Sequence, residues 1–393
     1  MKNLNVIFMG NYSYPQGMAA TKRIRHFAEY LVARQINTKV MLLRLSGSGH
    51  TESDTKGICN NVYYESIGNN IDINKNLLHL FYDALLYFMK GVFILYRWKS
   101  GRTKNILYCY NGLSIENALF VLAAKLFGYY IVFDIVEDHV LTQEKLHFLA
   151  KLKLYSVRVF EKHINKFANA IIVISYHLKE KFDKNSQNSI PIKLIPISAA
   201  CLDSTAVKMP GNPIKIVYTG SFARKDGVDL LLDAYGNLRK VNKNCILLLA
   251  GKSDNLSKIQ DLVAGKEGVS YLGYLDDRHF YELINDADIL CATRTGSAYA
   301  NAGFPFKLGE YLATGNPVIA SNVSDVSFYL QHMQDAIIVE PDNVFEIQKA
   351  LEFCINNPAK AKSIGENGRL KCIKYFSPEI NGQNLLELFH TLT

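Results

Sequence analysis

The stretch Gly303-Phe-Pro-Phe-Lys-Leu-Gly-Glu-Tyr-Leu-Ala-Thr-Gly-Asn-Pro-Val-Ile-Ala320 predicts a loop, a short helix and a buried strand in direct succession. Pro305 suits the first turn of a helix, because the N–H that it lacks has no partner there. Gly315 followed by Pro317 is typical of a helix end. The apolar residues from Val318 onward indicate a strand. The stretch therefore reads as one unit of an α/β fold.

Two charged side chains stand out in this short predicted helix. Lys307 falls in the first turn, where a cation opposes the helix dipole unless an anion binds there. Glu310 follows three residues later and shares a face with Lys307. A cation and a carboxylate at the mouth of a helix suit a ligand that has both phosphates and hydroxyls, such as a nucleotide sugar. An ordinary ion pair on the surface explains the pattern equally well.

Apolar runs alternate with helical patterns along nearly the whole chain, which predicts parallel sheets covered by helices on both faces. The strands expected in a first series are Leu4–Met9, Thr38–Leu43, Ile106–Tyr110, Tyr130–Ile135 and Ile171–Ile174. Those expected in a second series are Ile214–Thr219, Cys245–Ala250, Ser270–Leu272, Ile289–Ala292, Val318–Ala320 and Ala336–Val339.

The polar segment Asp203–Pro213 separates the two series and is the expected linker. A length of 393 residues also favours two domains. We expect a first domain over residues 1–200 and a second over residues 201–375. Both are expected to be Rossmann-like, doubly wound α/β domains that face each other across a cleft, with ligands at the carboxyl ends of the strands.

Charge is unevenly distributed along the chain. Residues 1–200 contain 25 Lys and Arg against 14 Asp and Glu, whereas residues 201–393 contain 19 against 22. The basic half is expected to meet an anionic partner, such as an acidic membrane surface or a lipid phosphate. Nucleic acid is not expected, because the aromatic residues do not interleave with basic ones.

The apolar segment Leu77–Trp98 is long enough to span a membrane, but charged residues interrupt it. We expect a helix that is either packed in the first domain or laid on a membrane surface. Cysteines without a Cys-x-x-Cys pair indicate a reducing compartment, and the apolar run Val6–Met9 is too short for a signal peptide. The expected location is cytoplasmic, or peripheral on the inner face of the cell membrane.

Three loops that follow predicted strands carry residues suited to phosphate binding. Gly17 lets the backbone N–H groups of the first loop approach an anion closely. Gly220, Arg224 and Lys225 stand before a helix in the second loop, and Arg294 lies in the third. Basic side chains of this kind can neutralise a diphosphate without a metal. Ordinary solvated strand–helix turns are the alternative for each loop.

The end of another predicted strand carries the titratable residues Glu137, Asp138 and His139, which suit polar work on a sugar hydroxyl. Helix capping and a partly exposed histidine are the alternative. The pair Asp286 and Asp288 has a spacing that some sugar transferases use for a metal. Asp288 leads straight into a strand, however, and no His/Cys cluster supports a metal site. We expect neither a metal nor a cofactor.

Taken together, these residues resemble the retaining GT-B-fold glycosyltransferases of family 4, from about Ile214 to Tyr375. The most specific part, Phe304–Ile319, is similar to the family pattern Pro-x-Lys-x-x-Glu-Tyr-x-Ala-x-Gly-x-Pro-Val. The resemblance implies that Glu310 holds the ribose hydroxyls. Ala302 stands where the family has its first glutamate, eight residues before Glu310, so backbone groups at Ala302–Phe304, with Gly303 between them, are expected to take over its role toward the donor sugar.

The resemblance also implies roles for the basic residues. Lys225, with Arg224 as the second candidate, and Lys307 are expected to stabilise the leaving diphosphate. One residue among Glu137, Asp138 and His139 is expected to face the donor sugar, with no unique choice. The last residues, 376–393, are expected to cross back onto the first domain.

The implied activity is transfer of a sugar from a nucleotide-diphosphate sugar to a glycan or a polyprenyl-diphosphate-linked acceptor, with retention, in surface polysaccharide biosynthesis. A sugar-nucleotide 2-epimerase of the same fold is one alternative. A non-catalytic, membrane-associated assembly protein is another. A nicotinamide dehydrogenase is a more distant one, because the dinucleotide glycine fingerprint is missing.

Overall fold

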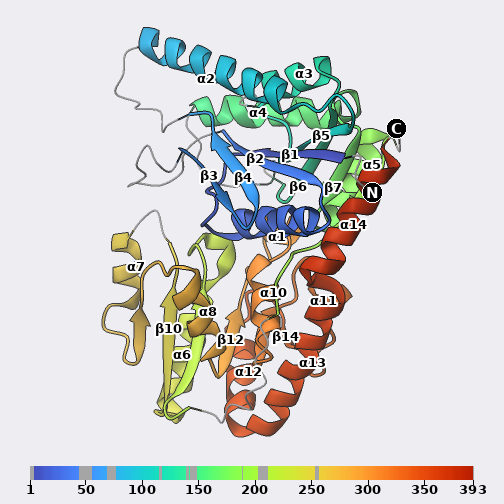
Figure 1. The fold of residues 1–393 in the computed structure, drawn as a ribbon. Coiled ribbons are helices and arrows are strands. Elements are labelled where there is room, and N and C mark those ends of the chain that lie inside the picture. Colours follow the sequence, from blue (N-terminus) through green and yellow to red (C-terminus); the bar gives the residue numbers. More distant parts are fainter. Residues whose placement is uncertain are drawn as a thin grey trace. The chain divides into compact units, whose positions relative to one another are not determined.

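The computed structural model describes residues 4–43, 55–68, 77–114, 117–138, 141, 148–187, 189–201, 211–252 and 256–392. The chain forms two compact units, which Figure 1 shows in the colours of the sequence. Unit 1 consists of Met1–Pro196 together with Pro378–Thr393, and unit 2 consists of Ile197–Ser377. The expected linker segment 203–210 and His139 lie outside the described residues.

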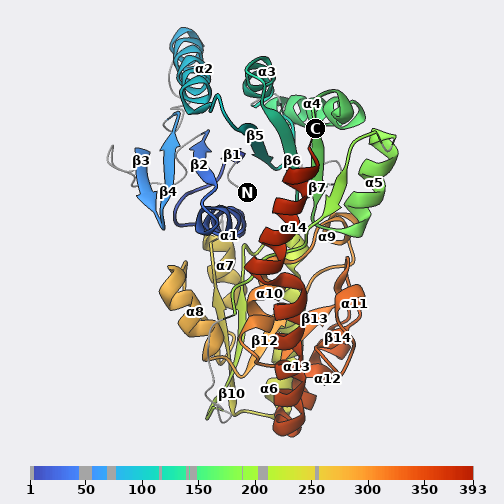
Figure 2. The ribbon, with the colours of Figure 1, turned by 45° about the vertical axis from the view of Figure 1, so that its right-hand side comes forward.

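Unit 1 is built on an eight-stranded sheet with the order β3-β4-β2-β1-β5-β6-β7-β8. Its strands are β1 (Leu4–Gly10), β2 (Asn37–Leu42), β3 (Lys56–Cys59), β4 (Val62–Ser66), β5 (Lys104–Tyr110), β6 (Tyr130–Ile135), β7 (Ala170–Val173) and β8 (Ile192–Leu194). Its helices are α1 (Ala19–Ala33), α2 (Leu77–Trp98), α3 (Ala118–Leu126), α4 (Phe148–Lys162), α5 (Tyr176–Ser186), α14 (Pro378–Thr391) and the 3-10 turn η3 (Ile164–Lys166). Figures 1 and 2 show α2, α3 and α4 on one face of the sheet, and α1 with α14 on the other.

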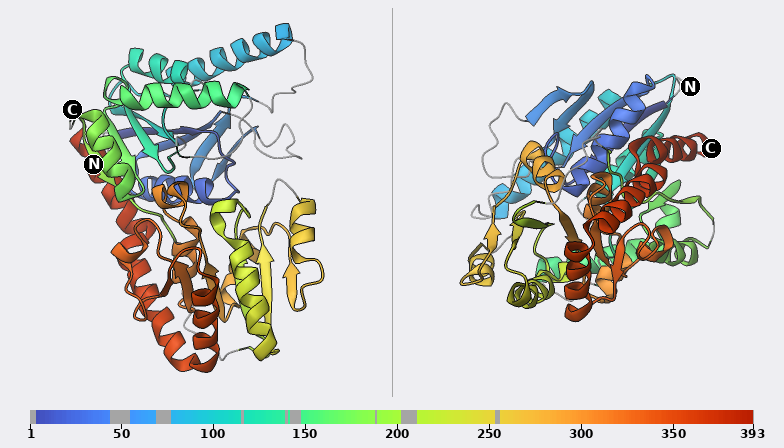
Figure 3. Two further views of the ribbon diagram at one scale, coloured as in Figure 1. Left: turned by 180° about the vertical axis from the view of Figure 1, so that it is seen from behind. Right: turned by 90° about the horizontal axis from the view of Figure 1, so that it is seen from below.

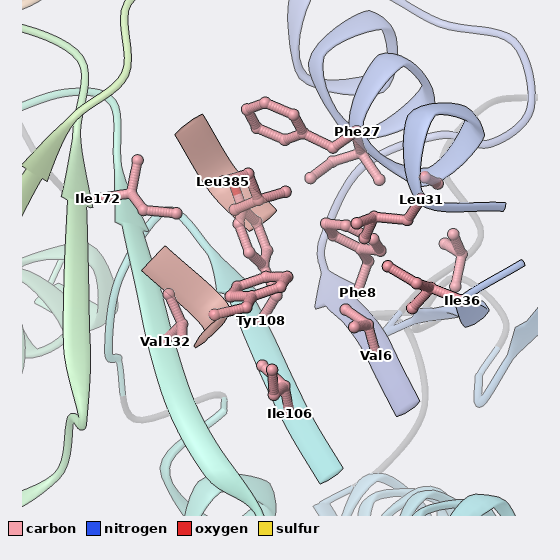
Figure 4. Close-up of a cluster of buried hydrophobic side chains, with 14 of the residues drawn as sticks. Val6, Phe8, Phe27, Leu31, Ile36, Ile106, Tyr108, Val132, Ile172 and Leu385 are labelled. Carbon is pink, nitrogen blue, oxygen red and sulfur yellow. The ribbon is translucent and has the colours of Figure 1, made fainter. Parts of the chain in front are cut away.

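The main core of unit 1 lies between its sheet and the pair of helices α1 and α14. Figure 4 shows Phe8 and Tyr108 from the sheet meeting Phe27 of α1 and Leu385 of α14, and all four are buried. The central strands of this sheet are buried on both faces, so they appear in the sequence as continuous apolar runs. For this reason they could be predicted. The last helix therefore completes a core that begins with the first strand.

One edge of this sheet departs from the prediction of purely parallel strands. Strand β3 pairs antiparallel with β4, and Asn60 and Asn61 form the turn between them with φ values of 47° and 63°. Asn tolerates this left-handed conformation, which tight hairpins require. The hairpin was missed because β3 is largely exposed and so lacks an apolar run. The short strand β8 at the opposite edge was also not predicted.

Unit 2 is built on a parallel six-stranded sheet with the order β11-β10-β9-β12-β13-β14. Its strands are β9 (Ile214–Thr219), β10 (Cys245–Ala250), β11 (Val269–Tyr271), β12 (Ile289–Ala292), β13 (Val318–Ser321) and β14 (Ile337–Val339). Its helices are α6 (Val228–Val241), α7 (Leu256–Val263), α8 (Asp277–Asn285), α9 (Ala298–Ala302), α10 (Phe306–Ala313), α11 (Val326–Tyr329), α12 (Val344–Asn356), α13 (Pro358–Phe376) and the 3-10 turn η4 (Arg224–Asp226). Helices α6 and α12 lie side by side (Figure 3), and α10 packs against α13.

In both units the chain starts in the middle of the sheet and reverses the direction in which it adds strands. In unit 2 the order is that of a Rossmann fold, and the reversal point lies between β9 and β12. Unit 1 shows the same order in β4-β2-β1-β5-β6-β7, with β3 and β8 added at its two edges. The predicted α/β class with two Rossmann-like, doubly wound sheets is confirmed.

Two helical glycines in unit 2 provide a matched test of the packing. A Cβ on Gly365 of α13 would lie 2.5 Å from the backbone carbonyl carbon of Asn316, whereas one on Gly236 of α6 would meet nothing within 4 Å. We expect Gly365→Ala to destabilise the protein by about 1–3 kcal/mol through overpacking. Gly236→Ala should instead stabilise it by about 0.5–1 kcal/mol, because alanine favours a helix.

Urea denaturation of both variants checks this prediction. Equal free energies of unfolding for Gly365→Ala and the wild type would contradict the close approach of α13 to the Gly315–Asn316 turn.

Candidate functional site

The candidate site lies in unit 2, at the carboxyl ends of β9 and β12, where the strand order reverses. The loop after β9 contains Gly220 and the turn η4, and the loop after β12 contains Arg294 and the short helix α9. The backbone N–H of Thr295 donates to the carbonyl of Lys225 at 3.1 Å and so ties the two loops together. Ligands of doubly wound sheets bind at this position.

A buried ion pair forms the centre of the site. Asp226 is 4% exposed, and its carboxylate lies 3.3 Å from Nζ of Lys307 and accepts a hydrogen bond from Ser221 at 3.0 Å. The Lys307 ammonium also lies 4.1 Å from the centre of the Tyr218 ring. Lys307 belongs to α10, which begins at Phe306, so its side chain crosses from the first turn of α10 to the loop after β9.

The electrostatics of this pair show a surplus of positive charge. Burial by itself raises the pKa of Asp226, but Lys307, Arg294 and Lys225 together outweigh it and hold the pKa at about 2. Burial lowers the pKa of Lys307, Asp226 partly offsets this, and the charges of Arg294 and Lys225 lower it further. One carboxylate therefore faces three cations. An anion in this position is favoured, because it would relieve their mutual repulsion.

The other two cations are held in place by the loop after β12. Arg294 is 6% exposed, and its guanidinium donates to the carbonyl of Ala300 at 3.1 Å. Its Nε has no hydrogen-bond partner among the described residues. Lys225 lies 4.5 Å from the centre of the Tyr299 ring, and α9 therefore positions both side chains. The sequence predicted a loop here and did not reveal α9.

The remaining predicted residues of unit 2 lie around this cluster. Gly220 approaches the lysine so closely that a Cβ on it would lie 2.6 Å from Nζ of Lys307. Glu310 is half-buried on α10, one turn after Lys307, and Arg224 is exposed in η4. Gly303 ends α9 and is buried, so it lies between α9 and α10.

Phe304 has a different environment from the one that a ligand-binding side chain needs. It is 3% exposed, and its ring packs against Tyr329 and Phe376 at centroid distances of 5.6 and 5.7 Å. The side chain therefore belongs to the core of unit 2. A ligand could meet only the backbone of Phe304, as the resemblance implied.

The predicted residues of unit 1 are held in local networks of that unit. Asp138 is 3% exposed, and its carboxylate lies 2.8 Å from Nζ of Lys181 and 3.6 Å from Nε2 of His177. Lys181 in turn pairs with Glu161 at 2.8 Å. Gly17 lies directly before α1, in a loop closed by a hydrogen bond from the Thr21 hydroxyl to the Ser13 carbonyl. Both belong to a different unit from the cationic cluster.

Sequence reasoning missed the carboxylate at the centre of the site. Asp226 lies in the loop after β9 beside Arg224 and Lys225, and an acid next to two cations before a glycine was a usable signal. Reasoning also missed the fully buried pair of Arg23 in α1 and Asp134 in β6, which are joined by hydrogen bonds of 2.7 and 3.0 Å. Here the signal was an arginine on the apolar face of a helix.

The Asp286–Asp288 pair is engaged by other protein groups. Asp288 accepts hydrogen bonds from the backbone N–H groups of Gly211 and Lys215 at 3.0 and 2.7 Å, and Asp286 pairs with the Lys215 side chain. Within the described parts of the chain, no group of three or more His, Cys, Asp or Glu residues has a geometry that could hold a metal ion.

Comparison with known proteins finds a family that the second unit matches. Residues 203–371 match the family described as Glycosyl transferases group 1. The glycosyltransferase YqgM of Bacillus subtilis is 25% identical over 239 residues, which are 59% of this chain and 64% of YqgM. The capsular polysaccharide biosynthesis glycosyltransferase CapM of Staphylococcus aureus is 21% identical over 63% of this chain and 68% of CapM. The chain thus spans somewhat less than two thirds of YqgM.

Solved structures share the fold over almost the whole chain. A sucrose-phosphate synthase from Thermosynechococcus elongatus matches with a TM-score of 0.76 and 17% identity, covering 99% of both chains. Anabaena HepE in complex with UDP and glucose matches with a TM-score of 0.73 and 16% identity, over 99% of this chain and 100% of HepE. The resemblance to GT-B-fold glycosyltransferases of family 4 is confirmed.

The buried carboxylate gives a prediction for the pH dependence of stability. The pKa of Asp226 is lower in the folded state, about 2, than its ordinary value of 3.8. Ionised Asp226 therefore contributes about 2 kcal/mol to the free energy of unfolding. This contribution is fully present above about pH 5 and is lost as the pH falls toward 2. At pH 7 the free energy of unfolding of Asp226→Asn should be lower than that of the wild type by this amount. The difference between the two free energies should shrink at low pH.

Urea denaturation at pH 7 and at pH 3 measures this difference. Asp233→Asn on the exposed side of α6 is the control, and we expect no comparable pH-dependent difference for it. A difference between Asp226→Asn and the wild type that stays constant between the two pH values would contradict the cationic surroundings of Asp226.

Proposed function

We propose that the chain, whose residues 203–371 match the group 1 glycosyl transferases, transfers a sugar from a nucleotide-diphosphate sugar. In this proposal the reaction retains the configuration at the anomeric carbon and uses no metal. The acceptor is a glycan or a polyprenyl-diphosphate-linked glycan, and the reaction serves the assembly of a surface polysaccharide. The name of CapM as a capsular polysaccharide enzyme supports this choice of pathway.

The observation that carries the proposal is the surplus of positive charge around Asp226. Breaking the bond between the sugar and the phosphate places negative charge on the leaving diphosphate. Lys307, Lys225 and Arg294 stand where preorganised cations can stabilise this charge, with Arg224 exposed beside them. Such fixed electrostatic interactions usually contribute most to catalysis. Asp226 holds the lysine in position while the two other cations leave the cluster positive.

The ribose and the sugar of the donor are assigned to α10 and to the turn between α9 and α10. We assign Glu310 to the ribose hydroxyls, because a half-buried carboxylate one turn from Lys307 can accept two hydrogen bonds. The backbone of Gly303 and Phe304 is assigned to the sugar. The first donors to test are UDP-sugars, since HepE, which shares the fold, was solved in complex with UDP-glucose.

The proposed chemistry needs no nucleophile from the protein. The acceptor hydroxyl attacks the face from which the diphosphate leaves, and the leaving phosphate takes up the proton of that hydroxyl. In unit 1, Gly17 remains a prediction for binding the phosphates of the donor, and one residue among Glu137, Asp138 and His139 remains a prediction for facing the donor sugar. A 2-epimerase would convert the donor without any acceptor, so incubation with the donor alone separates the two activities.

We also propose that unit 1 attaches peripherally to an anionic membrane. In the described part of the chain, no helix combines the length and the apolar character needed to cross a bilayer. Helix α2 nevertheless exposes Met89, Phe93 and Tyr96 by 60, 59 and 65%, and α3 exposes Leu126 by 87%. Aromatic and aliphatic side chains on one face, with basic residues nearby, suit the interface of an anionic bilayer.

The donor assignment predicts the effect of two substitutions on activity. Lys307→Met and Glu310→Ala should each lower sugar transfer by at least about 10²-fold, because each removes an oriented charge contact. Lys349→Met, on the exposed surface of α12, is the control and should keep wild-type turnover. Circular dichroism checks that the variants are folded, and wild-type rates in either site variant would refute the assignment.

Donor binding itself is tested by thermal denaturation with UDP-, GDP- and ADP-sugars. One nucleotide series should raise the melting temperature of the wild type, since a ligand at 100 times its Kd stabilises a protein by about 2.7 kcal/mol. The same donor should give a much smaller rise with Lys307→Met. A wild type that responds to none of the three series would speak against a nucleotide-sugar site.

A further inference from the structure

A groove in unit 1 lies outside the site described above. Helices α4 and α5 enclose a cavity of about 420 Å³. Its α5 wall is formed by Lys181 and Asn185, and its α4 wall by Tyr155, Arg158, Val159, Glu161 and Lys162. All of these α4 residues except Glu161 are spaced i, i+3, i+4 and i+7, so they form a single stripe along the helix. One side of α4 is thus turned toward this groove.

The charges of the groove are unbalanced. Lys181 lies 2.8 Å from both Asp138 and Glu161, and Arg158 also interacts electrostatically with Glu161. Among the residues that line the groove, Arg158, Lys162 and Lys181 therefore stand against the single carboxylate of Glu161, and both Arg158 and Lys162 are exposed. They stand one helical turn apart, where two like charges repel each other. An anion between them would remove this repulsion.

The same stripe also carries apolar side chains that face solvent. Tyr155 is 66% and Val159 39% exposed, and Leu152 on the preceding turn is 47% exposed. Figures 1 and 2 show α4 on the same face of the sheet as α2 and α3, whose apolar side chains are exposed as well. The groove therefore opens at the border of the apolar face of unit 1.

We propose that the α4–α5 groove binds the phosphate of an anionic membrane lipid between Arg158 and Lys162. This inference rests on the membrane attachment put forward under the proposed function and adds a defined headgroup site to it. Apolar side chains at an interface lie about 5–10 Å deep, at the boundary of headgroups and acyl chains. Cations on the same helix stripe then reach the level of the lipid phosphates.

The combination of charge and apolar surface favours a lipid over a free phosphate compound. Two exposed cations bind a small anion in water only weakly, because both partners are well hydrated and salt screens them. Next to a membrane each basic residue contributes about 1 kcal/mol. Tyr155 and Val159 add apolar contact that only a ligand with a hydrocarbon part can use.

The test compares two double variants with the same change of charge. Arg158→Gln with Lys162→Gln removes the groove cations, and Lys240→Gln with Lys243→Gln removes two exposed lysines from the end of α6 and the turn after it in unit 2. Binding is measured by flotation with vesicles of phosphatidylcholine alone or with one third phosphatidylglycerol. The groove variant should bind the anionic vesicles at least about tenfold more weakly, and the unit 2 variant less than about twofold.

Three outcomes would overturn the inference. Equal losses in both double variants would show non-specific attraction to the surface. Unchanged binding of the groove variant to anionic vesicles would show that the protein attaches to membranes without the groove cations. A rise in melting temperature with millimolar inorganic phosphate, present in the wild type and lost in the groove variant, would assign the groove to free phosphate compounds.

The same samples separate this inference from the proposed function. The groove variant should keep the thermal response to the nucleotide-sugar donor and the rate of transfer to a water-soluble acceptor. A wild type that fails to float with any vesicle would refute membrane attachment as a whole, and with it the lipid site. Circular dichroism and the melting temperature show whether the groove variant is folded. A folded groove variant that no longer responds to the donor would contradict the separation of the two sites.

Discussion

The structure of the donor site depends on one buried carboxylate that faces three cations. Asp226 is desolvated, yet Lys307, Arg294 and Lys225 keep it ionised. A buried ion pair costs much of its attraction in lost hydration, so the pair alone would add little stability. Its consequence is positional, because it fixes a lysine from the first turn of α10 against the loop after β9. The two further cations make the cluster positive, and this surplus gives the site its preference for an anion.

The fold supplies the geometry for this cluster. The strand order of unit 2 reverses between β9 and β12, and the loops after these two strands, which the hydrogen bond from Thr295 to Lys225 joins, carry Asp226 and Arg294. Gly220 allows the lysine of α10 to approach the backbone, since any side chain there would collide with its ammonium group. Helix α9 then holds Arg294 and Lys225 on the other side. The strand order and the small residues of the loops thus determine where the charged side chains of the site lie.

Much of this could be predicted from the sequence, because buried parallel strands appear as apolar runs and α10 has clear start and stop signals. The β3–β4 hairpin was missed, since an exposed edge strand lacks an apolar run. Asp226 was overlooked because its importance comes from Lys307, which lies 81 residues away in the chain. The spacing of residues in the sequence does not reveal which distant residue will be the partner in such a pair. The same holds for Arg23 and Asp134. The packing of the Phe304 ring also depends on the distant Tyr329 and Phe376.

The most direct test of the cationic cluster is the number of protons taken up when UDP binds. Burial and neighbouring cations lower the pKa of Lys307, and a bound diphosphate would raise it again. Isothermal titration calorimetry in buffers of different ionisation enthalpy, repeated over a series of alkaline pH values, measures this proton uptake. The account predicts that the wild type takes up more protons than Lys307→Met in part of this range. Binding of UDP without proton uptake at any of these pH values, or equal uptake by both proteins throughout, would contradict it.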